Sequence, residues 1–498
     1  MQRKPILPLL ILALACLSFS NPDVKTASEQ TMQQYRSCLV NANKKLVKEI
    51  TSPSFRAGIY QQPHAADMFR SFIDFVQMPD SMYWGDLQQE DGESFRMVNY
   101  VFGEKEMSSK VYFAPDGKLL FSDWIDQRGM GMNRKQESHF VAAVPFYLDG
   151  SKIIIPATLN KSARPLRMLF DTGADGMALV KSLQEDCEVK ITKSHTANVP
   201  GGQMQVNMSE GNTLVLDSLE IPNQNLVLFE NIGEGIDGII GGSNLFRNFI
   251  TEVDFENHLI KLYRIGDFEA PSEYQATPMS YASGVPTVPL HMHKDGKHFE
   301  CDFIFDTGAG YSAILFGSGM KQLENDSIYK TITPQYASFN KSLGGSAKIY
   351  IGQTDSLVFA NMNFPNASLA MEPYNPNNHA RHEVLGSIGI KSLSRMNWIV
   401  DLVSYQIYTT PNSYTTLPMD FIFEGYLLGY EGKQLKVLRP VSKETNENLK
   451  VGDEILKLGK YKAEELDDAK LTKSLATKKL KLKVLKPEGE EATVLIEN

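Results

Sequence analysis

The chain contains two copies of a short acidic motif whose residues could hydrolyse an amide bond. The copies are Asp171-Thr172-Gly173 and Asp306-Thr307-Gly308. An apolar run precedes each copy, as is typical of a buried strand that ends at a site, and glycine permits the tight turn that presents an acid there. Two carboxyl groups that face each other do not both ionise readily. Such a pair can therefore share one proton, so that one acid activates a water molecule and the other polarises a carbonyl group.

A longer series of segments surrounds each motif and repeats in the same order. A strand-like segment with a Val-Pro pair and an Asp-Gly turn precedes each motif, and a Gly-Gly turn follows it. The Gly-Gly turns are Gly201-Gly202 and Gly344-Gly345. Next comes an apolar pair before a glycine, which is Gly241 in the first half and either Gly386 or Gly389 in the second. Because Asp-Gly turns join antiparallel strands, this order predicts mainly β structure in two equivalent halves.

The repeated order resembles the aspartic peptidases of retropepsin-like and pepsin-like fold, in which two Asp-Thr-Gly lobes form one site. The resemblance implies two pseudo-symmetric β lobes, at residues 138–270 and 275–412, with the motifs at their interface. It makes Asp171 and Asp306 the catalytic pair of an endopeptidase that uses no metal and no other cofactor. The protein would then be a monomer that contains an intramolecular pseudo-dimer.

The resemblance also assigns supporting roles near the two acids. The supporting residues are Thr172, Gly173, Thr307 and Gly308. Thr172 and Thr307 should brace the two loops against each other, and the two Gly-Gly turns match the position of the hairpin flap that covers the cleft in this family. Pepsin-like members often carry a hydroxyl residue directly after the motif, where this chain has Ala174 and Ala309. Without that hydroxyl the pair should take up its shared proton at higher pH than a strongly acidic protease does.

Composition and charge restrict the classes of function. The chain has 498 residues, of which 42% are hydrophobic and 22% are charged, which is enough for three or four globular domains. A net charge of −9 and the lack of a basic stripe argue against a nucleic-acid partner. The 4 cysteines are scattered without metal-like spacing, which argues against a disulfide framework.

Residues 1–20 are typical of an export signal, with a basic start followed by an apolar stretch and small residues. The apolar stretch is too short to span a bilayer. Two interpretations of the cleavage site remain. A loose lipobox would place a lipidated Cys16 at the mature N-terminus, whereas ordinary cleavage would leave Asn21 first. In both cases we expect the protein in the periplasm or cell envelope, either anchored to the membrane by lipid or secreted.

The region 25–135 carries both helix and strand signals. The predicted helices lie at 29–50 and 65–76, and the predicted strands at 95–102, 110–113 and 119–124. These elements predict a small α+β domain. Two roles stay open for it: a prodomain or substrate-recruiting module, or a structural cap on the lobes.

Residues 415–498 form a separate module. The stretches 437–442 and 449–459 resemble bacterial PDZ domains of exported proteases, and 481–485 and 492–496 supply the closing strands. In that family a backbone loop and the strand after it capture an extended peptide by β-augmentation. The residues at the matching position are Gly425, Tyr426, Leu427 and Leu428. The resemblance implies a peptide-binding module that recruits substrate, and a packing domain that binds nothing is the alternative.

Two other patterns match binding motifs in part. Residues 233–238 have the GxGxxG spacing of a dinucleotide site, but the apolar residues that follow favour a glycine turn before a buried strand. His291 and His293 would share one face of a strand, with His298 nearby. Since no carboxylate or cysteine pattern completes a ligand set, we expect a solvated hairpin face and no metal site.

These features together predict an exported aspartic endopeptidase that acts on a peptide or protein substrate. The main alternative is a catalytically inactive peptide-binding scaffold that keeps the two lobes. The presence of both aspartates favours the enzyme.

Overall fold

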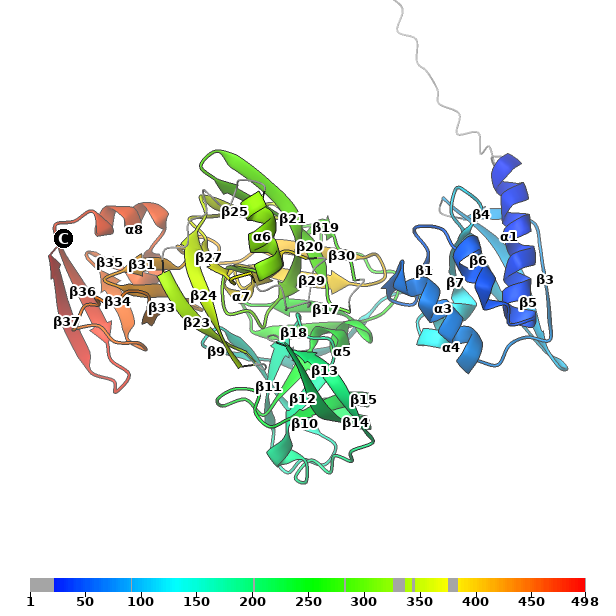
Figure 1. Cartoon of the computed structure of the whole chain (residues 1–498), viewed down its shortest axis with the longest axis horizontal. Helices are drawn as coiled ribbons and strands as arrows, with labels where there is room; N and C mark the ends of the chain where they lie inside the picture. Colours follow the sequence, from blue (N-terminus) through cyan, green and yellow to red (C-terminus); the bar gives the residue numbers. More distant parts are fainter. Residues whose placement is uncertain are drawn as a thin grey trace, which may run out of the picture. The chain divides into compact units, whose positions relative to one another are not determined.

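The computed structural model describes residues 22–497 apart from 91, 200–201, 282–283, 326–335, 343–344 and 375–383. The expected export signal, which includes Cys16, lies outside the described residues. The chain forms two compact units, Met1–Asn133 and Arg134–Asn498 (Figure 1). In the part of the chain that the structure describes, no helix has the length and apolar character needed to cross a bilayer.

The first unit combines α-helices with an antiparallel sheet. The helices are α1 (Pro22–Val40), α2 (Val47–Ile50), α3 (His64–Phe75) and α4 (Asp123–Met130). The sheet has the order β3-β5-β6-β7, formed by Ser81–Trp84, Glu93–Phe102, Lys105–Phe113 and Leu119–Ser122. A short strand, β4 (Gln88–Glu90), also pairs with β5.

Two element boundaries expected in this unit are wrong. The helix expected at 29–50 is interrupted near Ala42, whose φ of 51° lies in the left-handed region. The strand expected at 119–124 ends at Ser122, and Trp124 lies in α4 instead. Large apolar residues suit a buried strand and a buried helix equally, so their spacing did not separate the two.

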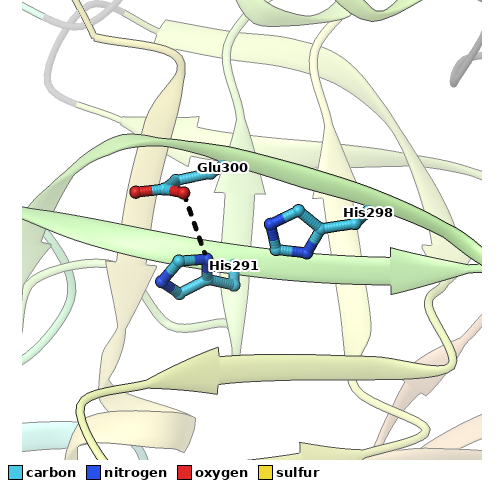
Figure 2. A group of neighbouring side chains, drawn as sticks. All are labelled: His291, His298 and Glu300. Carbon is cyan, nitrogen blue, oxygen red and sulfur yellow. Dashed lines mark ion pairs between the residues drawn. The ribbon is translucent and has the colours of Figure 1, made fainter.

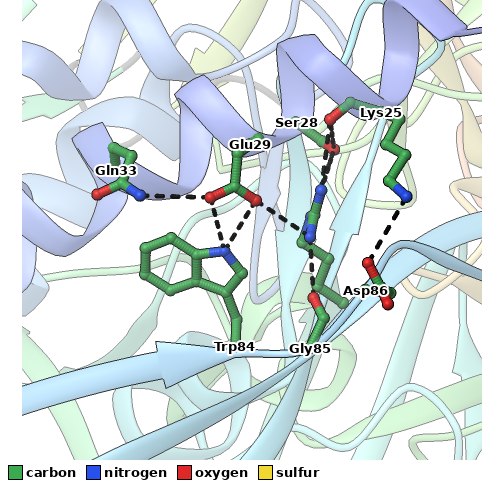
Figure 3. Close-up of polar contacts among 8 residues, drawn as sticks. Lys25, Ser28, Glu29, Gln33, Trp84, Gly85 and Asp86 are labelled. Atoms are coloured by element: carbon green, nitrogen blue, oxygen red, sulfur yellow. Dashed lines mark hydrogen bonds and ion pairs between the residues drawn. The ribbon is translucent and has the colours of Figure 1, made fainter.

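A buried arginine connects the first helix to the sheet of this unit. Arg96 lies on β5, is 3% exposed, and donates hydrogen bonds to the carbonyl oxygens of Gly85 and Lys25. Its guanidinium also lies 3.2 Å from the carboxylate of Glu29. That carboxylate accepts from the indole N–H of Trp84 (Figure 3). Because buried charge is tolerated only when it is paired, this network fixes α1 against the sheet.

The second unit contains two large mixed sheets. The first has the order β13-β14-β15-β12-β16-β11-β10-β9. Its strands, from β9 to β16, are Tyr147–Asp149, Lys152–Leu159, Leu166–Asp171, Met177–Val180, Lys193–Val199, Gly202–Leu216, Leu219–Phe229 and Gly238–Gly241. We call this part, residues 138–270, lobe 1.

The second of these sheets has a similar arrangement from β23 to β20 and differs at its end, where β25 and β26 follow. Its order is β23-β24-β27-β22-β28-β21-β20-β25-β26. The strands, from β20 to β28, are Thr287–Lys294, Lys297–Asp306, Ala313–Leu315, Tyr336–Ser342, Gly345–Gln353, Ser356–Phe359, Met362–Pro365, Ser368–Met371 and Gly386–Gly389. We call residues 275–412 lobe 2. In each lobe the strand that ends at an aspartate lies parallel to a short strand bounded by glycines, β11 with β16 and β21 with β28.

A third sheet joins the two lobes, with the order β19-β30-β29-β17-β18-β8. Lobe 1 supplies β8 (Phe140–Pro145), β17 (Phe249–Asp254) and β18 (Leu259–Arg264), and lobe 2 supplies β19 (Gln275–Pro278), β29 (Met396–Asp401) and β30 (Gln406–Pro411). At its centre β17 and β29 pair antiparallel, with Glu252 opposite Ile399. Backbone hydrogen bonds therefore run from one lobe into the other.

The C-terminal module is a sheet with one longer helix, α8 (Asp468–Leu475), whose first turn is capped by the carboxylate of Asp467. The main strands are β31 (Phe421–Phe423), β32 (Tyr426–Glu431), β33 (Gln434–Pro440), β34 (Glu454–Leu458), β36 (Lys479–Leu485) and β37 (Glu491–Glu497). The closing strands predicted at 481–485 and 492–496 lie within β36 and β37.

Candidate active site

Asp171 and Asp306 occupy equivalent places at the ends of two buried strands. Asp171 ends β11 and lies opposite Gly241 on the parallel strand β16. Asp306 ends β21 and lies opposite Gly389 on β28. The phenylalanine before each aspartate is fully buried. Since such side chains are close-packed, the core of each lobe fixes the position of its acid.

The loops that carry the two aspartates meet each other. A Cβ atom on Gly173 would lie 2.4 Å from the carboxyl carbon of Asp306, and a Cβ atom on Gly308 would lie 2.4 Å from that of Asp171. Each carboxyl group therefore packs on the bare backbone of the opposite loop. This reciprocal packing brings the two acids to one place and explains why both positions need glycine.

Two buried threonines connect the same loops. The Thr172 hydroxyl donates to the carbonyl oxygen of Phe305 at 2.6 Å and accepts from the N–H of Thr307 at 2.9 Å. The Thr307 hydroxyl donates to the carbonyl oxygen of Phe170 at 2.9 Å and accepts from the N–H of Thr172 at 3.0 Å. These four bonds are the mutual bracing that the resemblance predicts. They also give partners to four backbone groups that are costly to bury alone.

Backbone N–H groups orient both carboxylates. Oδ1 of Asp171 accepts from the N–H of Gly173 at 2.9 Å. Oδ1 of Asp306 accepts from the N–H of Gly308 at 2.9 Å and from that of Ala309 at 3.1 Å. Both aspartates are half-buried. Two oriented carboxyl groups in one half-buried place can share a proton and activate a water molecule.

Two further glycines, on the neighbouring parallel strands, leave room for the aspartate loops. A Cβ atom on Gly241 would lie 2.6 Å from the carbonyl oxygen of Ala174, and one on Gly389 would lie 2.6 Å from that of Ala309. Any side chain there would displace the loop. The sequence left Gly386 and Gly389 as alternatives, and the strand register identifies Gly389 as the equivalent of Gly241.

The candidate flaps are antiparallel hairpins. Strand β13 pairs with β14, and β23 pairs with β24. Gly202 and Gly345 begin the second strand of each hairpin. The other two glycines of these turns, Gly201 and Gly344, lie outside the described residues. That the hairpins cover a cleft stays a prediction.

Peptide binding by the C-terminal module stays a prediction, and the strand pairing bears on where it could occur. The residues concerned are Gly425, Tyr426, Leu427 and Leu428. Glu424 and Gly425 have φ angles of 52° and 77° and form a two-residue hairpin turn. Through this turn β31 pairs with β32, with Phe421 opposite Leu428, while β33 pairs with the other edge of β32. At residues 426–428, the strand edge that β-augmentation would use is therefore paired with β31.

Lobe 2 contacts the module through two buried cations. Lys391 lies on the short helix α7 (Ile390–Leu393), is 6% exposed, and donates to the carbonyl oxygen of Tyr430 at 2.6 Å. Arg395 donates to the carbonyl oxygen of Leu417 and to that of Pro418, the latter at 2.6 Å. Burial lowers the pKa of Arg395 to about 10. Such cations are costly to leave without partners, so the module and the lobe depend on each other.

The two partial binding motifs have different outcomes. Gly233 and Gly235 lie in a loop with positive φ, and Gly238 begins the buried strand β16, which confirms the expected glycine turn before a buried strand. We expected no carboxylate near His291, His293 and His298 that could complete a set of metal ligands. That expectation is wrong. Glu300 lies opposite His291 in the β20–β21 ladder. Alternation along one strand does not reveal which residue lies opposite on the neighbouring strand, so the sequence did not indicate Glu300.

The family match found by comparison with known proteins lies within lobe 1. Residues 155–243, which include Asp171, match a family model described as aspartyl protease. Among solved structures, the chain is similar to a crystal structure of aspartic proteinase from Irpex lacteus, with 13% identity and a TM-score of 0.38, over 56% of this chain and 99% of that chain. A search of curated proteins found no match. The family match supports an aspartic peptidase fold for the segment that carries the first motif.

Proposed function

We propose that the protein is an endopeptidase in which Asp171 and Asp306 act as one pair that holds a single proton. The ionised carboxylate takes a proton from water as the water oxygen attacks the peptide carbonyl carbon, and the protonated carboxyl gives its proton to the carbonyl oxygen. The tetrahedral intermediate then loses its C–N bond. One acid protonates the leaving amine and the other recovers a proton from the intermediate, so the pair ends with one proton again.

The observation that supports this proposal most strongly is the packing of each carboxyl group on the glycine of the opposite loop. Bringing two acids together is unfavourable, because like charges at one place resist ionisation. A scaffold that only binds peptides has no need of such a pair. The match of residues 155–243 to an aspartyl protease family agrees with the enzyme, and the inactive alternative is not favoured.

For the C-terminal module, the contacts favour a supporting role over recruitment of substrate at β32. The edge of β32 is paired with β31, and the carbonyl oxygen of Tyr430 accepts from Lys391 of lobe 2. A peptide that bound this edge would have to displace part of the chain itself. We therefore propose that the module stabilises lobe 2.

Cleavage of a mixed peptide library by the purified protein, followed by mass spectrometry, tests the proposed activity. Wild-type protein should produce defined cleavage products, and Asp171→Asn should produce none. The same products from Asp171→Asn would assign the cleavage to a contaminant or to a different site. Loss of wild-type activity after metal chelation would also contradict the mechanism.

A further inference from the structure

We propose that the hairpin formed by β20 and β21 binds a divalent transition-metal ion of the Zn²⁺ class through His291, His298 and Glu300. This site is separate from the aspartate pair. Imidazole nitrogen and carboxylate oxygen are common ligands of Zn²⁺ in proteins.

The register of the hairpin gathers these side chains. His291 lies opposite Glu300, and His293 lies opposite His298. Residues two apart on a strand share a face, so both pairs stand on the same side of the hairpin. One possible ligand atom from each of His291, His298 and Glu300 lies within 4.8 Å of the others. Figure 2 shows the two rings and the carboxylate on one side of the strands.

The spacing fits a metal ion better than a closed ion pair. Nδ1 of His291 lies 3.6 Å from Oε2 of Glu300, which is longer than a hydrogen bond. Two ligand atoms of a tetrahedral Zn²⁺ site stand about 3.3 Å apart, given bond lengths of about 2.0–2.1 Å. Glu300 and His298 are exposed and His291 is half-buried. Small rotations of these side chains are therefore enough to reach ligand spacing.

The ligand types select the class of ion. Ca²⁺ and Mg²⁺ need several oxygen ligands, and this group offers a single carboxylate. Imidazole suits Zn²⁺ and its neighbours among the transition metals. The ring of His293 lies 4.8 Å from that of His298, centroid to centroid, so either His293 or water can take the fourth position.

The backbone under the site is already braced. Asp355 accepts hydrogen bonds from the N–H of Asp295 at 2.7 Å and from Nζ of Lys294 at 3.2 Å. Its own N–H donates to the carbonyl oxygen of His293 at 2.9 Å. Because these bonds hold the turn between the two strands, a metal ion would not have to order the hairpin when it binds.

The site is remote from the aspartate pair. Glu300 precedes Asp306 by six positions on β21, which corresponds to about 20 Å along an extended strand. The metal should therefore crosslink β20 and β21 without entering the reaction. This distance allows the two proposals to fail independently.

Titration of ZnCl₂ into the metal-free full chain, made without a histidine tag and followed by calorimetry, tests the site. We expect one Zn²⁺ per chain and a rise of a few degrees in Tm. His298→Gln and Glu300→Gln should each weaken binding at least about tenfold. His64→Gln, which removes an exposed histidine of the first unit, is the matched control and should bind as wild type does.

Several outcomes would overturn the site. These are the absence of Zn²⁺ binding, equal affinity in wild type and both hairpin variants, or equal loss in His64→Gln. Binding of CaCl₂ or MgCl₂ with similar affinity would contradict the proposed class of ion. Peptide cleavage by His298→Gln should match wild type. If the wild-type protein binds Zn²⁺ but cleaves no peptide, the peptidase proposal is wrong and the metal site stands.

Discussion

Thr172 and Thr307 are 135 residues apart in the chain, and each binds the backbone of the other's loop. Each hydroxyl accepts from the N–H of the opposite threonine and donates to the carbonyl oxygen that precedes the opposite aspartate. One loop therefore cannot shift without the other. Proton sharing between two carboxyl groups requires a fixed separation, and these bonds maintain it.

Replacing Thr172 by valine should weaken both stability and cleavage. Valine keeps the shape but leaves the N–H of Thr307 and the carbonyl oxygen of Phe305 without this partner, which should lower the free energy of unfolding by about 1–3 kcal/mol. Serine keeps the hydroxyl and should be tolerated better. Chemical denaturation and kcat/KM on a peptide measure the two effects. Equal behaviour of Thr172→Val and Thr172→Ser would contradict the bracing role.

Gly173→Ala should abolish cleavage, because the added Cβ would lie 2.4 Å from the carboxyl carbon of Asp306. Gly310 is the matched control, since a Cβ atom there meets nothing within 4 Å. Gly310→Ala should therefore stay within about 0.5 kcal/mol of wild-type stability. Cleavage rates and thermal unfolding of both variants check this. Full activity of Gly173→Ala would show that the carboxyl group does not pack on that glycine.

The pH dependence of cleavage should be a bell centred in mildly acidic to neutral conditions. Its two limbs belong to the pair of acids and not to one residue. Ala309 carries no hydroxyl, and its N–H lies 3.1 Å from Oδ1 of Asp306. Ala309→Ser would add a donor beside that carboxylate and favour its charged form, so the acidic limb should move to lower pH. A profile of kcat/KM against pH measures the shift, and an unchanged acidic limb would contradict this account of the alanines.

Deletion of residues 415–498 should reduce cleavage of a short peptide and of a long protein to a similar extent. The deletion leaves Lys391 and Arg395 of lobe 2 without the carbonyl partners that the module provides, so lobe 2 should lose stability. Parallel rates on the two substrates, with thermal unfolding of the truncated chain, test this role. Selective loss on the protein substrate would instead support recruitment by the module.

The candidate active site could be predicted from the sequence, because the motif that marks it is short and occurs twice. Each Asp-Thr-Gly motif combines an apolar strand, an acid and a turn glycine within a few residues, and each half places them in the same order. The bracing by Thr172 and Thr307 followed from the resemblance to a two-lobed family. The sequence could not decide between Gly386 and Gly389, because both follow apolar residues and only strand register distinguishes them.

The features that the sequence analysis missed depend on pairing between strands. The hairpin that covers the edge of β32 requires Phe421 to lie opposite Leu428, and the cluster around His291 requires Glu300 on the neighbouring strand. A shift of one residue in register would send each side chain to the other face. The Glu424-Gly425 turn could have indicated the β31–β32 hairpin, since a two-residue turn with glycine joins antiparallel strands.

The most direct test of the central claim is a double-mutant cycle on the acid pair. It compares kcat/KM for wild type, Asp171→Asn, Asp306→Asn and the double variant on one peptide substrate. If the two acids act as one unit, each single variant should lose cleavage entirely and the double variant should be no worse than either. Full cleavage by either single variant, or losses that multiply in the double variant, would contradict a shared-proton pair.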